Sequence, residues 1–229
     1  MVLAIMQTTR AAIWDVDGTL VDTAELHYEA FRRFAAEEGR AFSRADFVWT
    51  FGRRNPEIMV ELFGERGAGE AGRAMAHRKE EYYREAARAG VQLLPGAQSL
   101  IDQLAAAGWA QAIGSSAPPA NLELILALTG VGPHMRAVIS GDDTERGKPD
   151  PEVFLTAARR CGVPPEQCVV FEDAVAGVQA ARAAGMACVA VTFCAHSTPA
   201  ELTRAGAHVV VASLAELSLA DLDALLARG

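Results

Sequence analysis

The sequence is short of features that mark several protein classes. It has four cysteines in 229 residues, none in a C-x-x-C pair and none with a histidine at zinc-ligand spacing, so neither a redox motif nor a zinc site is expected. Of the four, Cys161, Cys168 and Cys188 lie among apolar residues and are expected to act as small hydrophobes, with all thiols free in a reducing compartment. No run approaches the roughly 18–20 apolar residues that a membrane span requires. The apolar run 1–6 has no preceding basic residue and no convincing cleavage site, so we expect no signal peptide and a soluble, cytoplasmic protein.

Positive charge is also scarce. The chain carries 21 Lys and Arg against 29 Asp and Glu, a formal charge of −8. Nucleic acids are held mainly by clustered lysines and arginines, so a nucleic-acid partner is not expected. A small anionic substrate fits this charge, because one metal ion, a helix N-terminus and a few local cations are enough to bind it. A monomer is the simplest expectation.

The composition is that of a folded domain, with 51% hydrophobic and 22% charged residues. After residue 96, helical segments alternate with short apolar strands, which predicts a doubly wound parallel sheet of the α/β class. The expected strands are 11–16, 109–114, 137–140, 168–171, 187–192 and 208–211. The expected helices between them are 97–107, 119–128, 151–161 and 175–184, and helical turns are expected to end the chain.

The region between the first two strands is helical in pattern. Helix-start signals occur at Ser43 and at Asn55-Pro56, and the Ala-, Arg- and Glu-rich stretch 69–89 is expected to be a long, solvent-covered helix. No strand is expected there. The chain is therefore divided into a core of residues 1–24 and 92–229 and an all-helical insert of residues 25–91.

The most distinctive segment is Asp15-Val16-Asp17-Gly18-Thr19, at the carboxyl end of the first strand. Ligands bind at this edge of open parallel sheets. Asp15 and Asp17 are two residues apart, so both are expected to face one site while the strand persists. Paired carboxylates repel each other unless a cation neutralises them, and Mg²⁺ suits oxygen ligands together with a substrate phosphate. An Asp-rich turn and helix cap is the alternative.

Three later strand ends carry complementary groups. Ser115 and Ser116 offer hydroxyl and N–H groups to phosphate oxygens, or cap a helix. Lys148, between Gly and Pro, can neutralise a carboxylate and a phosphate, although an isolated lysine is usually solvated. Glu172-Asp173 suit a hard metal ion, or cap the next helix. Four such groups on one sheet edge share no single structural explanation.

In this order the four segments resemble the four motifs of the haloacid dehalogenase (HAD) superfamily over essentially the whole chain. The insert resembles its C1 helical cap, and the chain is similar to the β-phosphoglucomutase and phosphoglycolate phosphatase-like subfamily. The resemblance implies a Rossmann-like core, a Mg²⁺ cofactor and an aspartyl-phosphate intermediate. It also implies hydrolysis of a small phosphorylated metabolite such as a sugar or polyol phosphate.

The resemblance also implies residue roles. Asp15 would be the nucleophile, and Asp17 the general acid and then the base. Ser115 would bind the transferring phosphoryl group, and Lys148 would tie that group to Asp15. An Asp at position 17 is typical of the phosphatases and phosphomutases of the superfamily, because an alcohol oxygen needs a proton as it leaves.

Further roles concern the metal and the loops. Asp173 and Glu172 would hold the metal ion together with Asp15 and the backbone carbonyl of Asp17. Thr19 would orient the first loop. Thr19 and Ser116 are also candidates for contact with the substrate.

The insert carries the remaining substrate-binding candidates. His27 resembles the mutase histidine that gates proton transfer and cap closure, and Lys79 a substrate-binding mutase lysine. The alternative for His27 is a half-buried residue of a helix, and the alternative for Lys79 is a position on a solvated helix face. Asn55 stands where the mutases have a phosphate-binding arginine, for which Arg53 or Arg54 are the candidate substitutes.

The absence of that arginine favours hydrolysis over mutation of a phosphosugar, because a mutase must retain a bisphosphate. A β-phosphoglucomutase-type enzyme remains the main alternative. A non-enzymatic phosphoacceptor module is less favoured, because receiver-like domains are shorter and carry the phosphorylated Asp on a later strand.

Overall fold

The computed structural model describes residues 9–227 apart from residue 51. The run 1–6, on which the prediction about a signal peptide rests, lies outside the described residues. Within them six parallel strands form one sheet in the order β3-β2-β1-β4-β5-β6. The strands are β1 (Ala11–Trp14), β2 (Ala110–Gly114), β3 (Ala137–Ile139), β4 (Cys168–Glu172), β5 (Ala187–Val191) and β6 (Val209–Val211). The prediction of a doubly wound α/β sheet is confirmed.

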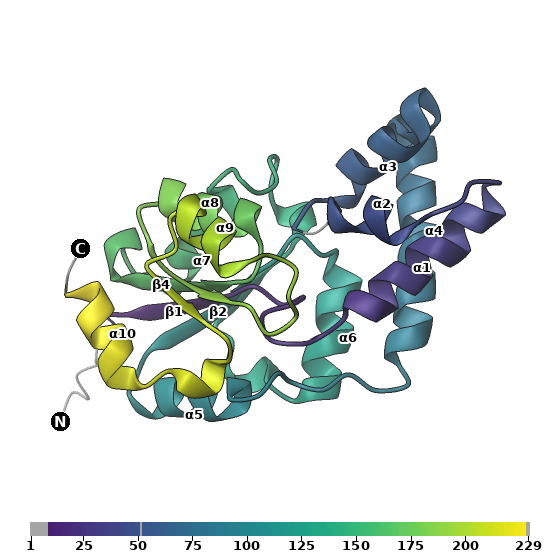
Figure 1. The fold of residues 1–229 in the computed structure, drawn as a ribbon. Helices are drawn as coiled ribbons and strands as arrows, with labels where there is room; N and C mark the ends of the chain where they lie inside the picture. The colour runs from purple at the N-terminus through teal and green to yellow at the C-terminus, as the bar shows by residue number, and fades with distance from the viewer. Residues whose placement is uncertain (1–8, 51, 228–229) are drawn as a thin grey trace.

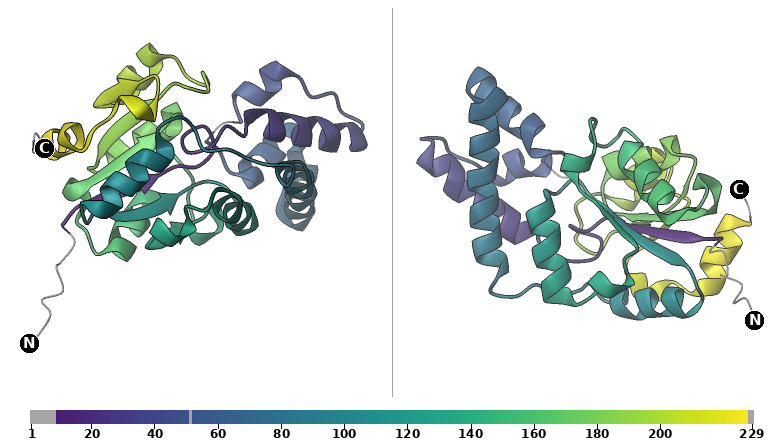
Figure 2. Two further views of the ribbon diagram at one scale, coloured as in Figure 1. Left: turned by 90° about the horizontal axis from the view of Figure 1, so that it is seen from below. Right: turned by 180° about the vertical axis from the view of Figure 1, so that it is seen from behind.

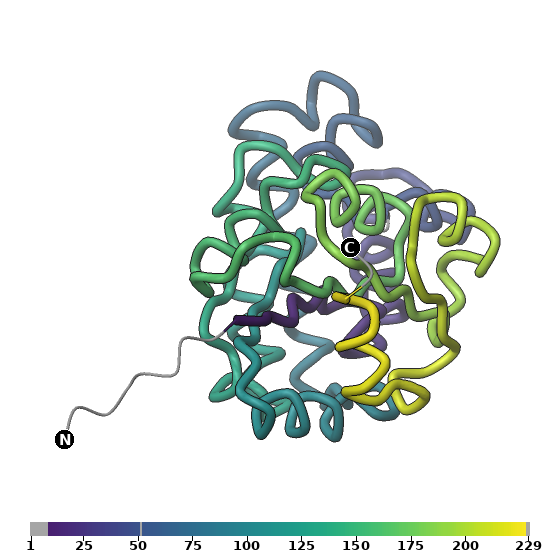
Figure 3. Tube along the Cα trace, turned by 90° about the vertical axis from the view of Figure 1, so that its left-hand side faces the viewer, coloured from purple at the N-terminus to yellow at the C-terminus, as the bar shows by residue number. Residues whose placement is uncertain are grey.

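Helices cover both faces of this sheet because side chains of each strand alternate between them. Ala12 and Trp14 of β1 pack toward α5 (Ala97–Ala106) and α10 (Leu219–Leu226). Ala11 and Ile13 pack on the other face. The helices of that face are α7 (Glu152–Cys161), α8 (Val175–Ala183) and α9 (Pro199–Ala205). In Figure 3 the two groups of helices lie below and above β1, drawn in purple.

A helical group stands off one end of the sheet (Figures 1 and 2). It contains α1 (Ala24–Glu37), α2 (Arg44–Val48), α3 (Asn55–Phe63) and α4 (Gly69–Ala87). We call this group the cap. It is joined to the sheet by two neighbouring segments, since Val21 forms a bridge with Leu93 and the Leu94 N–H donates to the Leu20 carbonyl over 2.7 Å. The division of the chain at residues 25 and 91 stays a prediction.

The cap contains its own aromatic core. Phe31 stacks on Phe42 with ring centroids 5.1 Å apart, and Phe34 meets Phe63 edge-on at 5.6 Å. Ser43 caps α2 as expected, with its side chain accepting from the Asp46 N–H. This packing gives the cap a rigid frame that holds its polar side chains over the end of the sheet.

Three details differ from the sequence expectations. The first strand ends at Trp14, two residues early, because the chain turns into the loop around Gly18. Helix α9 was not expected, although Thr198, Pro199 and Glu201 form a capping box with proline in the first turn. Helix α4 is not solvent-covered throughout, because one side of it packs on α1 and the core and buries residues including Lys79.

Helix α6 (Pro119–Thr129) follows β2 and lies beside the cap (Figure 1). It contacts α4, so the cap touches the core beyond the two connecting segments. All four cysteines are free, and three of them are buried. Over the described part of the chain, no helix has both the length and the apolar character needed to cross a bilayer.

Candidate active site

The centre of the site is a cluster of buried charges at the carboxyl ends of β1 and β4. Asp15 follows β1, Glu172 ends β4 and Asp173 follows it. Lys148, from the loop before α7, donates to Asp15 Oδ1 and Glu172 Oε1, each over 2.6 Å. Each of these residues is at most 7% exposed. The strand order makes the cluster possible, because β1 lies between β2 and β4 at the point where the chain reverses direction across the sheet.

The cluster holds more negative than positive charge when its groups are ionised. Burial raises the pKa of Asp15 well above its usual range; Lys148 opposes this shift, and Glu172 and Asp173 add to it. Burial likewise raises the pKa of Asp173 to about 6, although His196 opposes it. Oxygens of Asp15, Glu172 and Asp173 lie within 4.8 Å of one another. This set of oxygen donors fits a hard divalent cation, which would relieve the repulsion between them.

Glu172 is fixed by the backbone that follows it. Its Oε2 accepts from the N–H groups of Asp173 and Ala174 over 2.9 and 3.0 Å, just before α8 begins. Gly177 in the first turns of α8 packs directly on this carboxylate, because a Cβ at that position would lie 1.8 Å from Glu172 Oε1. Glycine at 177 therefore leaves the space that Glu172 occupies.

The substitution Gly177→Ala is expected to displace the Glu172 carboxylate and, through it, Lys148. A displacement of about 1 Å at reacting groups can cost on the order of 100-fold in rate, so we expect a loss of that order in kcat. Gly132→Ala is the matched control, since its nearest neighbour would lie at 3.7 Å. The measurement is the steady-state kcat of both variants. A wild-type kcat in Gly177→Ala would contradict the view that Gly177 leaves the space in which Glu172 is held.

Asp17 does not join this cluster. Because the strand ends at Trp14 and Gly18 adopts a φ of 86°, the Asp17 carboxylate turns toward the cap instead. Its Oδ1 lies 3.2 Å from His27 Nε2 and 3.5 Å from the Tyr83 hydroxyl. The strand therefore does not persist to Asp17 as expected, although Asp15 and Asp17 still line one cavity.

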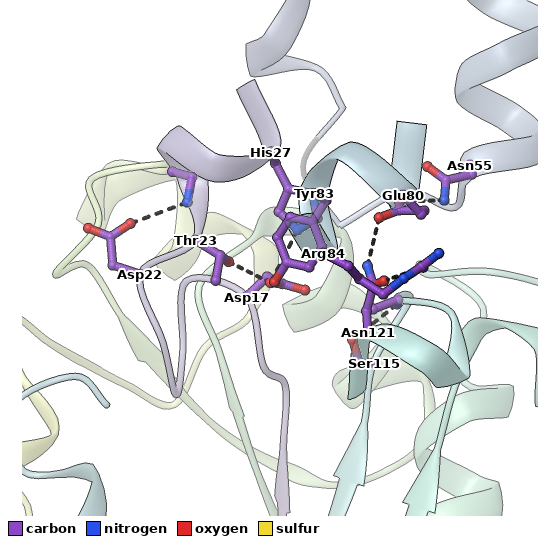
Figure 4. Close-up of polar contacts among 12 residues, drawn as sticks. Asp17, Asp22, Thr23, His27, Asn55, Glu80, Tyr83, Arg84, Ser115 and Asn121 are labelled. Atoms are coloured by element: carbon purple, nitrogen blue, oxygen red, sulfur yellow. Dashed lines mark hydrogen bonds and ion pairs between the residues drawn. The ribbon is translucent and has the colours of Figure 1, made fainter. Parts of the chain in front are cut away.

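The surroundings of Asp17 favour its ionised form. Burial alone would raise its pKa, but the electrostatic interaction and hydrogen bond with His27, the hydrogen bond from Thr23 and the charge of Lys79 together lower it to about 2. Figure 4 shows Thr23, His27 and Tyr83 converging on this carboxylate. An ionised Asp17 is ready to accept a proton.

His27 and Lys79 act as a pair. The Lys79 ammonium lies 2.9 Å from His27 Nδ1 and, because an ammonium only donates, Nδ1 accepts and Nε2 carries the proton toward Asp17. Lys79 is 2% exposed, so the solvated-face alternative is wrong, whereas its contact with substrate stays a prediction. The chain has only two lysines, Lys79 and Lys148, and both are buried in the site.

The hydroxyl residues of the loops have separate positions. Ser115 follows β2 and is buried, with its Oγ accepting from the Ala117 N–H over 3.1 Å. Ser116 donates to the carbonyl of Gly52 in the cap over 2.9 Å. Thr19 is buried 3.5 Å from Asp173 Oδ1, a position from which it can orient the first loop against the fourth.

The two arginines of the cap differ in position. Arg53 lines the cavity above the cluster and lies over the Trp49 ring at 5.1 Å. Arg54 lines a neighbouring hollow and donates to the carbonyls of Thr144 and Glu145 in the core, each over 2.9 Å. Arg53 is therefore the better placed of the two for contact with a substrate.

The cavity between cap and core has a volume of about 80 Å³. Charged, polar and apolar side chains all line it. Its lining includes Asp15, Asp17, His27, Phe31, Phe47, Arg53, Asn55, Ile58, Lys79, Glu80, Ser115, Ser116, Glu172 and Asp173. The structure thus brings most of the expected site residues around one cavity.

Sequence reasoning missed several members of the site. His196 Nδ1 lies 2.7 Å from Asp173 Oδ2, and both side chains are buried. Glu80 accepts from Asn55 over 2.7 Å and from Asn121 over 2.6 Å. No spacing pattern links these residues, because each pair joins separate elements.

The chain matches known proteins over most of its length. A family model described as haloacid dehalogenase-like hydrolase matches residues 9–185. The fructose-1-phosphate phosphatase YqaB of Escherichia coli K12 is 35% identical over 183 residues, 78% of this chain and 94% of that protein. The β-phosphoglucomutase of Mycobacterium tuberculosis is 32% identical over 248 aligned positions, with 94% of each chain covered.

A solved structure agrees with these sequence matches. The crystal structure of CbbY from Rhodobacter sphaeroides in complex with phosphate aligns with a TM-score of 0.82 at 29% identity. The alignment covers 94% of this chain and all of that one, 100%. The similarity therefore extends over the sheet and the cap together.

Proposed function

Because this chain belongs to the haloacid dehalogenase-like hydrolases, we propose that it is a Mg²⁺-dependent phosphatase acting on a sugar or polyol monophosphate through a phosphorylated Asp15. Its relatives include a phosphatase of a phosphorylated sugar, and it is a phosphoric monoester hydrolase. The observation that carries the proposal is the buried cluster in which Lys148 joins Asp15 and Glu172 beside a cavity between cap and core.

In the first step an oxygen of Asp15 attacks phosphorus while the bond to the leaving alcohol oxygen breaks. Lys148 neutralises charge on the transferring group and Ser115 donates a hydrogen bond to it. Mg²⁺, held by Asp15, Glu172 and Asp173, would offset the negative charge of the phosphoryl oxygens. A carboxylate nucleophile divides one difficult displacement into two easier ones.

Asp17 serves both steps. A phosphoryl group bound nearby adds negative charge, which raises the pKa of Asp17 and lets it carry a proton to the leaving oxygen. Once the leaving alcohol departs, the ionised Asp17 takes a proton from the water that attacks the phosphorus of phosphorylated Asp15. His27 and Tyr83 orient the carboxylate for both transfers.

A phosphate-release screen tests this proposal. Sugar, polyol and small-acid monophosphates are each incubated with the enzyme in Mg²⁺ and in EDTA. We expect release from a few related sugar or polyol phosphates, in Mg²⁺ only. Release that is equally fast in EDTA would contradict the metal-dependent mechanism, and no release from any compound by folded enzyme would contradict the assignment as a phosphatase.

A phosphosugar mutase is the second candidate, because the His27–Lys79 pair reaches Asp17 and a β-phosphoglucomutase is among the relatives. Asn55 opposes it. Its amide donates to Glu80 over 2.7 Å, so it is engaged in the cap rather than held as a clamp for a second phosphate. Formation of glucose 6-phosphate from β-glucose 1-phosphate and a bisphosphate primer, faster than phosphate release, would favour the mutase.

A further inference from the structure

The core contains a buried side-chain amide that forms hydrogen bonds to the cap. Asn121 in the first turn of α6 is 1% exposed. Its Nδ2 donates to Glu80 Oε2 over 2.6 Å, and its Oδ1 accepts from Arg84 Nη1 over 3.0 Å. Figure 4 shows Asn121 below α4 with both contacts in place. Glu80 and Arg84 belong to the cap, so these bonds cross from cap to core.

The residue type at 121 matches its two neighbours. A guanidinium only donates hydrogen bonds, and an ionised carboxylate only accepts them. The pKa of Glu80 is lowered, since its neighbours Lys79, His27 and Asn121 outweigh burial, which opposes the shift. Of the uncharged side chains, an amide is the one that offers a fixed donor and a fixed acceptor side by side. Asn121 therefore satisfies Arg84 and Glu80 at once.

Helix α4 has two adjacent stripes of side chains with different partners. Glu80 and Arg84, four residues apart, face α6 of the core. Lys79 and Tyr83, also four residues apart, face His27 and Asp17. A helix rotates and slides as one body. Hydrogen bonds that hold the first stripe on α6 therefore also fix the axial position and rotation of the second stripe.

Glu80 also joins the two stripes directly. Its Oε1 accepts from Lys79 over 2.8 Å, while its Oε2 accepts from Asn121. A continuous chain of contacts therefore runs from α6 through Glu80, Lys79 and His27 to Asp17. All members except His27 and Asp17 are at most 4% exposed, so water competes little for these bonds.

We propose that Asn121 is a positioning residue, which docks α4 onto the core so that Lys79 and His27 are held on Asp17 only while the cap is closed. The inference rests on the proposed role of Asp17 in proton transfer. It extends that role to a residue of the core that contacts neither the substrate nor the reacting groups. Cap closure and the placement of the proton-transfer group become one event.

The test exchanges donor and acceptor at this contact. Asn121→Asp, measured at pH 8 so that a carboxyl beside Arg84 stays ionised, places two carboxylates against each other. We expect faster hydrogen exchange in residues 79–84 and 119–125 of the ligand-free enzyme, and a fall in kcat on the order of 10- to 100-fold. Adding Glu80→Gln restores an amide donor facing a carboxylate acceptor, and should recover on the order of tenfold of that loss.

The matched control is Thr129→Ala at the far end of α6, where the hydroxyl bonds only within its own helix, to the Ile125 carbonyl over 2.7 Å. It should behave as wild type. If Asn121 does not act through its contact with Glu80, adding Glu80→Gln should recover nothing, and the double variant should be no better than Asn121→Asp. That result, or an unchanged kcat and exchange in Asn121→Asp, would overturn the proposal.

The exchange measurement separates this inference from the proposed function. If no phosphate ester is hydrolysed by the wild type but the exchange rates rise and recover as expected, the docking role stands and the phosphatase assignment falls. If hydrolysis is observed and neither exchange nor kcat responds to Asn121→Asp, the docking role alone is wrong.

Discussion

Asp15→Asn is expected to abolish phosphate release, with kcat reduced by at least about 10⁴-fold, the range seen when a covalent nucleophile is removed. The substitution preserves shape but replaces the anionic carboxylate with a neutral carboxamide, which is too weak a nucleophile to attack phosphorus. Folding should survive, because Lys148 keeps Glu172 as its other partner over 2.6 Å. Phosphate release on the best substrate of the screen is the measurement, with circular dichroism as the check on folding.

The control for this variant is Asp142→Asn. Asp142 is an exposed aspartate of the core that lines the neighbouring hollow rather than the catalytic cavity. It should retain wild-type kcat. If Asp15→Asn also retains it, Asp15 is not the phosphoryl acceptor and the proposed mechanism fails at its first step.

Lys148→Met is expected to make the fold depend on a divalent cation. Removing Lys148 leaves Asp15, Glu172 and Asp173 buried together without their cationic partner. Breaking a buried ion pair from one side costs about 3–5 kcal/mol, so the free energy of unfolding in EDTA should fall by about that much. Turnover should fall by about 10³-fold, since the cation that neutralises the transferring group is also lost.

Urea unfolding with and without Mg²⁺ measures this effect. Mg²⁺ should stabilise Lys148→Met by more than it stabilises the wild type, because the ion then replaces the positive charge that Lys148 supplied to Asp15 and Glu172. Equal stabilisation of both proteins by Mg²⁺ would mean that the ion does not bind at these carboxylates. Gly132→Ala serves again as the neutral reference, since it is remote from the cluster in its contacts.

The α/β core was the most predictable part of the molecule. Short apolar strands alternating with helices allow few arrangements, and a parallel sheet brings strand ends to one edge. Asp15, Ser115 and Glu172 could therefore be expected near one another although they are far apart in sequence. Strand limits were less predictable, since burial alone does not tell Trp14 from the residues that follow it.

Side-chain direction in the first loop could not be predicted. Whether Asp17 faces Asp15 or the cap depends on where the strand stops and on the φ of Gly18. The sequence carries no local signal for that choice. His27 of the cap contacts the Asp17 carboxylate. The direction of this side chain therefore depends on a contact between separate parts of the fold.

The cap was predicted as helical but not in its packing. Helix α4 contains many charged residues, which suggested a solvated surface, yet Lys79 and Glu80 neutralise each other over 2.8 Å and are buried. The role of Asn121 could not be predicted either, because its partner Glu80 lies 41 residues away in another element. The scarcity of lysine is a signal that sequence reading could have used, because both lysines of the chain lie in the site.

The central claim is that a phosphoryl group passes through Asp15, and trapping that group tests it most directly. The enzyme is mixed with its best substrate and Mg²⁺, quenched in acid within the first turnover, digested and analysed by mass spectrometry. The account predicts the mass of one phosphoryl group on the peptide that contains Asp15, located on that residue, and its disappearance as phosphate is released. Phosphate release with no phosphorylated peptide at any time, or with the group on another residue, would contradict it.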